Sequence, residues 1–104
     1  MAEHHLTLRP TVIGGDRLED DFCVYRDGRS IGRIVLAENH VKHVEVWRWH
    51  INPPLPIPNW ANGSARTREG AQAEFRAAWQ RFYASLKPES ITHWHAIDDA
   101  RKGR

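Results

Sequence analysis

The chain has 104 residues, of which 40% are hydrophobic and 27% charged, and its formal net charge is +2. That length fits one small domain, and the composition excludes a disordered or fibrous chain. No apolar run approaches the ~20 residues that a membrane helix needs, and the N-terminal run MAEHHLTLRP lacks the apolar stretch of a secretory signal. We therefore expect a single cytoplasmic domain over residues 1–104, without membrane contact.

A single cysteine, Cys23, excludes an intrachain disulfide and favours a reducing compartment. It lies between Phe22 and Val24 in a predicted strand, so we expect a small, buried and unreactive side chain. The chain also has five Trp, three Phe and two Tyr residues. Each aromatic side chain buries about 150–250 Å², so these rings must supply much of the core.

The N-terminal half alternates between apolar and polar residues, with turn residues between the runs, which predicts an antiparallel meander. Pro10 makes the first run an edge strand. Asp27-Gly28 is a strong hairpin signal, and we expect Arg29 and Ser30 to extend that loop. The predicted strands are Leu6–Ile13, Asp21–Asp27, Ile31–Ala37 and His43–Ile51.

A proline-rich loop and a long helix are predicted next. Asn52–Ala65 has four prolines within six residues, which excludes helix and interior strand and predicts a loop that lies against the domain. Thr67–Lys87 is an amphipathic helix with Thr67 as its N-cap and Pro88 as its stop. Apolar residues at spacings of three and four form the stripe that should face the core: Ala71, Phe75, Ala78, Trp79, Phe82 and Leu86.

These elements predict an α+β fold of two layers. An antiparallel sheet of three to four strands, in β-β-β-α or β-β-β-β-α order, packs on the one long amphipathic helix. We expect the core to span about residues 6–87. The tail, residues 88–104, is predicted to hold a short strand or a helical turn, with frayed last residues.

The segment Val44–Ile51 (VEVWRWHI) has two tryptophans one residue apart, so Trp47 and Trp49 share one face of a strand. On that face they complement the helix stripe and form the core, which is the interpretation we favour. The opposite orientation would expose both rings beside Arg48 as a stacking platform for bases, each worth about 1–3 kcal/mol. A bulge would place one ring on each side. The sequence leaves these alternatives open.

Seven histidines are many for this length. His93 and His95 have a spacing that puts both imidazoles on one side of an extended segment. With His50 they form a candidate metal site, although structural zinc sites favour cysteine and the sequence has neither a CxxC nor an HExxH motif. Because no nucleophile motif is present either, we expect no catalytic residue, no cofactor and no enzyme activity.

The sequence pI of about 9.0 just reaches the range that suggests nucleic-acid binding. A three-stranded sheet followed by a helix is similar to the small DNA-binding domain of some phage-type integrases, which lays its sheet in the major groove, but this likeness is one of fold alone. The acidic run Leu18–Asp21 argues against a uniformly basic face. The candidate nucleic-acid-binding residues are Arg29, Arg33, Arg48, Arg66 and Arg68, with Arg101, Lys102 and Arg104 in the tail.

The run DGRSIGRIV, followed by WRWHI, a proline-broken loop and NGSARTREGAQAEFRAAW, resembles a group of short single-domain proteins from rhizobia and related alphaproteobacteria. The resemblance covers about Phe22 to Trp79 and is most specific from Asn62 to Trp79. It implies a bacterial origin and a single domain, and it implies neither an activity nor a functional residue. We therefore expect a small non-catalytic binding or interaction module of unknown partner. The alternatives are nucleic acid bound by the sheet face and the hairpin arginines, and self-association as a homodimer.

Overall fold

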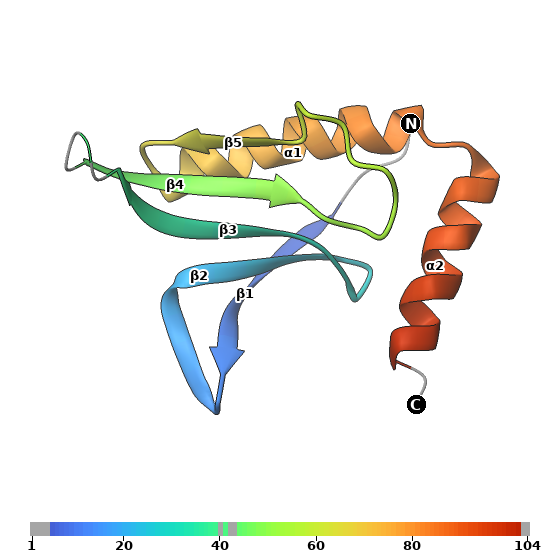
Figure 1. Cartoon of the computed structure of the whole chain (residues 1–104), viewed down its shortest axis with the longest axis horizontal. Helices are drawn as coiled ribbons and strands as arrows, with labels where there is room; N and C mark the ends of the chain where they lie inside the picture. Colours follow the sequence, from blue (N-terminus) through green and yellow to red (C-terminus); the bar gives the residue numbers. More distant parts are fainter. Residues whose placement is uncertain (1–4, 40, 42–43, 103–104) are drawn as a thin grey trace.

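The computed structural model describes residues 5–39, 41 and 44–102. Within this part of the chain, five strands are followed by two helices (Figure 1). Neither of these helices is long and apolar enough to cross a membrane. The strands are β1 (Leu6–Ile13), β2 (Asp16–Arg26), β3 (Arg29–Asn39), β4 (Val44–Ile51) and β5 (Asn62–Ala65), and the helices are α1 (Arg68–Ser85) and α2 (Pro88–Lys102).

The strands form one antiparallel meander in the order β1-β2-β3-β4-β5. The predicted hairpin is present, because Asp27 and Gly28 both have positive φ, 52° and 78°, as the central residues of a type I′ turn require. β3 begins at Arg29, so Arg29 and Ser30 pair with β2 instead of extending the loop. Pro10 lies in the edge strand β1, as expected for a residue without a backbone N–H.

α1 lies across one face of the sheet, chiefly over β3, β4 and β5 (Figure 1). Thr67 caps this helix, because its hydroxyl accepts the Gly70 N–H at 2.9 Å. The stripe predicted from the sequence is the side that packs on the sheet. Ala71, Phe75, Trp79 and Phe82 are buried, and Ala78 and Leu86 are half-buried.

Both tryptophans of β4 face α1, which confirms the core interpretation of the pair. Trp49 is 6% exposed, its ring meets Phe75 edge-on at 6.0 Å, and its indole N–H donates to Glu74 Oε1 at 2.8 Å. Trp47 is half-buried and packs against the Phe22 ring at 6.4 Å. The pairing of β4 with β3 has no irregularity. The exposed stacking platform and the bulge that would split the pair are therefore wrong.

The α+β class is confirmed, but the predicted sheet of three to four strands on a single helix is too small. β5 lies inside the segment predicted as a proline-rich loop and pairs with β4. Its sequence, NGSA, has no β-branched or aromatic residue and so carries no strand signal of its own. Gly63 suits the position because a Cβ there would lie 2.8 Å from the Trp49 ring. Tertiary packing, rather than local propensity, makes this strand.

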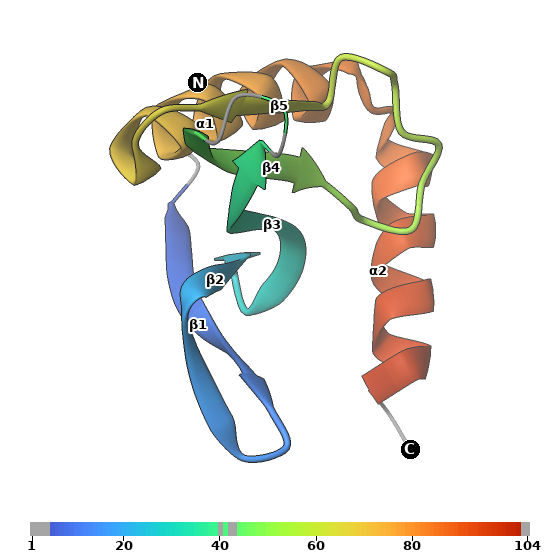
Figure 2. The same ribbon diagram turned by 60° about the vertical axis from the view of Figure 1, so that its left-hand side comes forward.

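The tail predicted as a short strand or a helical turn is a full helix, α2, which stands at the end of the sheet and is steeply inclined to α1 (Figure 2). Trp94 is fully buried, with its ring edge-on to Trp79 at 5.8 Å. The core therefore extends beyond the predicted limit at residue 87. Arg29 ties α2 to the β2–β3 hairpin through ion pairs of 2.9 Å with both Asp98 and Asp99.

Gly32 of β3 lies at close range to α1 and to β4. A Cβ added there would meet the Phe75 ring and would lie 2.5 Å from the His50 carbonyl oxygen. We expect Gly32→Ala to lower the free energy of unfolding by about 1–3 kcal/mol, because a packed core accepts an added methyl only by shifting. Urea unfolding followed by tryptophan fluorescence measures this effect. Ser30→Ala on the same strand is the control, and an unchanged stability of Gly32→Ala would contradict this packing.

Candidate functional site

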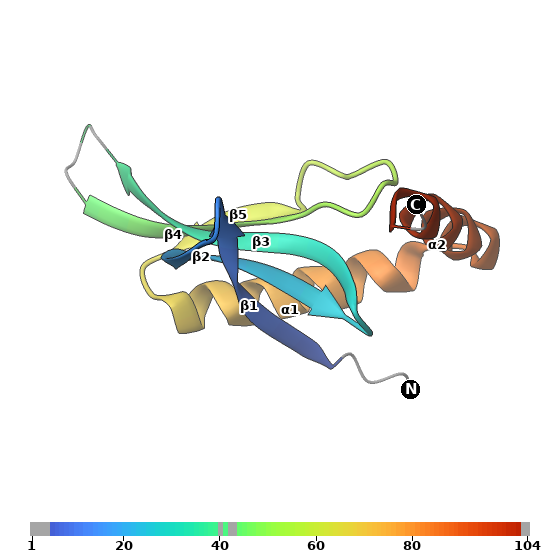
Figure 3. The ribbon, with the colours of Figure 1, turned by 90° about the horizontal axis from the view of Figure 1, so that it is seen from below.

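α1 covers one face of the sheet and α2 lies at its end, so neither described helix covers the other face (Figure 3). We call this other face the open face. Strand pairing places its side chains in two adjacent rows that run across the sheet. The longer row is Arg9, Cys23, Arg33, His50 and Asn62, and the shorter row is Asp21, Val35, Arg48 and Ser64.

Asp21 and Arg33 form the polar centre of the open face. The Arg33 guanidinium donates from Nε to Asp21 Oδ1 at 2.7 Å and from Nη2 to Oδ2, so the pair is bidentate. The Thr11 hydroxyl also donates to Oδ1, at 2.8 Å. These bonds, that of Arg33 foremost, hold the pKa of Asp21 below its usual 3.8 against the opposing effect of burial. Asp21 therefore stays ionised and fixes the Arg33 side chain.

His50 lies directly across from Arg33 on the neighbouring strand. Loss of hydration first, and the positive charge of Arg33 second, lower the pKa of His50 below its usual 6.5, although Asp21 opposes the shift. The imidazole is therefore neutral near pH 7 and has one N–H donor and one acceptor nitrogen. A hollow of about 400 Å³ adjoins it, lined by Arg48, Trp49, His50, Asn62, Gly63 and Ser64.

The predicted nucleic-acid-binding arginines do not all gather on one surface. Arg33 and Arg48 are diagonal neighbours on β3 and β4, with Cα atoms about 7–8 Å apart in such a pair. Arg29 is instead engaged in the ion pairs to α2, which raise its pKa. Arg66 is exposed between β5 and α1, and Arg68 of α1 stacks over an aromatic ring at 5.1 Å on the covered side. The structure thus brings Arg33 and Arg48 together and places Arg29 and Arg68 elsewhere.

The predicted histidine metal site is not assembled. His93 and His95 lie in α2, where residues two apart point about 200° apart around the helix axis, so the expected extended arrangement is wrong. His50 belongs to β4 and to the open face. Among the residues that the structure describes, no group of three or more His, Cys, Asp or Glu side chains could hold a metal ion.

The open face also contains residues that the sequence did not single out. Asp21 belongs to the acidic run that argued against a basic face, and its pairing with Arg33 depends on a strand register that no local pattern reveals. Asn62 and Ser64 lie on β5, which has no strand signal. Cys23, which was expected to be buried, is half-buried on this face.

Comparison with known proteins adds no assignment: no family model, no curated protein and no solved structure matches this chain. A function is therefore argued from the residues themselves. The open face offers guanidinium groups, a neutral imidazole, an amide and a hydroxyl on one regular surface. Groups of this kind bind partners through charge-assisted and neutral hydrogen bonds.

Asp21→Asn keeps the size of the side chain and removes its charge. Because the native pKa of Asp21 is lowered, its ion pair stabilises the fold above the unfolded pKa of about 3.9, and the stabilisation is lost as pH falls through the native pKa. We expect a cost of about 1 kcal/mol at pH 7, since Arg33 is 41% exposed and water screens the pair. Urea unfolding at neutral and acidic pH measures it.

The cost of Asp21→Asn should shrink as the pH is lowered below about 4. Glu19→Gln, an exposed carboxylate on the same strand, is the matched control and should change stability little at either pH. A cost for Asp21→Asn that stays constant across this range would contradict the ion-pair assignment.

Proposed function

We propose that this protein is a small non-catalytic binding module that holds an anionic partner on the open face, and that the partner is a nucleic acid. The observation that carries the proposal is the diagonal placement of Arg33 and Arg48 on a sheet surface that neither described helix covers. Guanidinium groups bind phosphate oxygens through paired N–H bonds, and sheets contact nucleic acid directly in several DNA-binding folds.

Neighbouring side chains support this assignment. Arg9 lies at the β1 end of the longer row and stacks on the Tyr25 ring at 4.7 Å, which adds another cation to the face. Asp21 is a carboxylate within the rows, but its charge is matched by Arg33. Uncharged groups that can bond to phosphate or sugar oxygens lie beside these charges. They are His50, Asn62 and Ser64.

The small number of cations limits the expected affinity. Beside the charge-matched Asp21–Arg33 pair, the two rows hold two further cations, Arg9 and Arg48. With about two phosphate contacts, log affinity should fall against log salt with a slope no steeper than about −2. Non-specific dissociation constants are typically about 10⁻⁴–10⁻⁶ M at physiological salt. We therefore expect weak binding that is strongest at low salt and shows little dependence on base sequence.

Self-association is a second candidate, and the far end of the β1–β2 hairpin favours it. Val12 and Ile13 are 60% and 59% exposed there, and β1 is an edge strand. Pro10 and the irregular register between Pro10 and Val12 weigh against edge-to-edge pairing, because both interrupt the ladder. Sedimentation equilibrium at micromolar concentration separates the two candidates, because only self-association predicts a dimer without nucleic acid.

Fluorescence anisotropy with a labelled duplex of about 20 base pairs, at about 50 and about 200 mM salt, tests the nucleic-acid proposal. Arg48→Glu should weaken binding roughly tenfold and make the salt slope about one unit shallower, because it removes a phosphate contact and adds a repulsive charge. The matched control is Arg81→Glu, the same charge change at an exposed arginine of α1, which stacks on the Trp60 ring at 3.9 Å. No binding at low salt, or equal losses in the two variants, would refute the proposal.

A further inference from the structure

His50 lies beside two arginines on the open face. Arg33 is directly across from it on β3, and Arg48 precedes it by two residues on β4, so all three side chains leave the same side of the sheet. An imidazole changes its charge between about pH 5 and 8. Protonation of His50 would therefore add a third positive charge next to two permanent ones.

The described titratable and charged groups around His50 come from three strands. They are Arg33 on β3, Asp21 and Cys23 on β2, and Arg48 on β4 itself. Guanidinium groups stay protonated, and hydrogen bonds hold the pKa of Asp21 below its usual 3.8. Cys23 lies behind Arg33 in the longer row, one strand farther from His50. The positive charge that appears among these groups as the pH falls is therefore that of the imidazole.

Without a ligand, the surroundings oppose protonation of His50. Partial loss of hydration, followed by the positive charge of Arg33, lowers the pKa of the imidazole below its usual 6.5. An anion placed between His50 and Arg48 would reverse this balance, because it attracts the imidazolium and offsets the repulsion between the cations. The phosphates of a nucleic acid each carry a negative charge. A phosphate bound there would raise the pKa of His50.

The hollow on the open face gives such a phosphate a place to bind. Its lining of about 400 Å³ includes Arg48 and His50, with Asn62 and Ser64 on the β5 side. Both Arg48 and His50 are exposed, so a ligand reaches them from solvent. The Asn52 amide nitrogen lies 3.5 Å from His50 Nε2, at the outer limit of a hydrogen bond, and the ring can therefore exchange this contact for a ligand.

We propose that a phosphate of the nucleic acid binds in this hollow between Arg48 and His50, and that His50 takes up a proton from solvent when it binds. This inference rests on the nucleic-acid function proposed above and adds the control of that function by pH. Both the Arg48 guanidinium and the imidazolium donate N–H bonds to the phosphate oxygens. Because the complex holds one more proton than its free components, its affinity rises as the pH falls.

The gain is limited to one charge. A hydrogen bond to a charged group is stronger than a neutral one, and the difference corresponds to an affinity about five- to tenfold higher at a pH of about 5.5 than at about 8. The additional cation should also make the dependence of log affinity on log salt steeper by about one unit. Below the pKa of free His50 the affinity should level off, since the free protein then carries the proton as well.

Fluorescence anisotropy with the same labelled duplex, at about 50 mM salt and pH values from about 5.5 to 8, tests the proton coupling. His50→Gln has a polar side chain that never ionises, so it should match the native affinity at the highest pH and lose the gain at low pH. His50→Lys is permanently charged, so it should bind at high pH as tightly as the native protein does at low pH. The control is His93→Gln, the same change at an exposed histidine of α2, which should keep the native pH dependence.

Proton NMR of the His50 ring measures the protonation directly. The pKa of His50 should be higher in the complex with the duplex than in the free protein, because the bound phosphate stabilises the imidazolium. Protonation of the duplex itself does not affect the comparison, since every variant meets the same DNA. Circular dichroism at each pH checks that the variants are folded.

An equal pH dependence in the native protein and in His50→Gln, or an unchanged pKa of His50 in the complex, would overturn this inference. If the duplex still binds and Arg48→Glu still weakens it, the proposed function stands and the proton coupling alone is wrong. Absence of binding at low salt and at every pH would overturn both.

Discussion

The structure depends on one layer of aromatic rings packed between the sheet and the helices. Trp49 meets Phe75 where β4 packs on α1, and Trp79 packs against α2, with all these rings at most 6% exposed. Side chains alternate along a strand, so the inward tryptophans of β4 turn Arg48 and His50 outward. Burial of the aromatic layer therefore determines which side chains lie on the open face. The composition of the candidate site is thus a consequence of how the core packs.

Elements with strong local signals could be predicted from the sequence, and elements made by tertiary packing could not. Alternation in β4, the Asp27-Gly28 turn and the apolar stripe of α1 are local patterns with a direct physical cause. β5 is held by its pairing with β4 and by the fit of Gly63 against Trp49, and neither is visible in NGSA. α2 buries Trp94, and most of its other residues are polar. Its sequence therefore lacks the clear apolar stripe by which an amphipathic helix is predicted.

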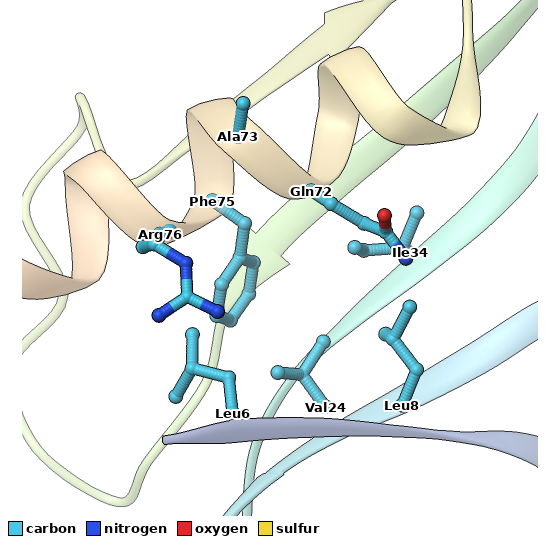
Figure 4. Close-up of a pocket in the computed structure, with 8 residues that line it drawn as sticks. All are labelled: Leu6, Leu8, Val24, Ile34, Gln72, Ala73, Phe75 and Arg76. Carbon is cyan, nitrogen blue, oxygen red and sulfur yellow. The ribbon is translucent and has the colours of Figure 1, made fainter. Parts of the chain in front are cut away.

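The same division applies to the candidate site. Arg33 and Arg48 were predicted as binding residues, and alternation assigns them to one face once the register is known. The bonds of Arg33 to Asp21 and of Arg29 to α2 depend on register and on the position of α2, which no local pattern encodes. Charge composition alone therefore does not locate a binding surface, because some arginines hold the fold together while others face solvent. The hollow on the open face and a second hollow between β1 and α1, lined in part by Leu6, Leu8 and Gln72, lie on opposite sides of one sheet (Figure 4).

The most direct test of this assignment of the two faces is a nitrogen–proton NMR spectrum, covering backbone amides and tryptophan indoles, recorded with and without duplex DNA at low salt. We predict shifts at the amides of Arg33, Arg48 and His50. The indole signal of Trp49 should stay in place, because its N–H points to the helix side and is bonded to Glu74. A large shift of that indole signal, with unchanged amides on β3 and β4, would contradict the assignment.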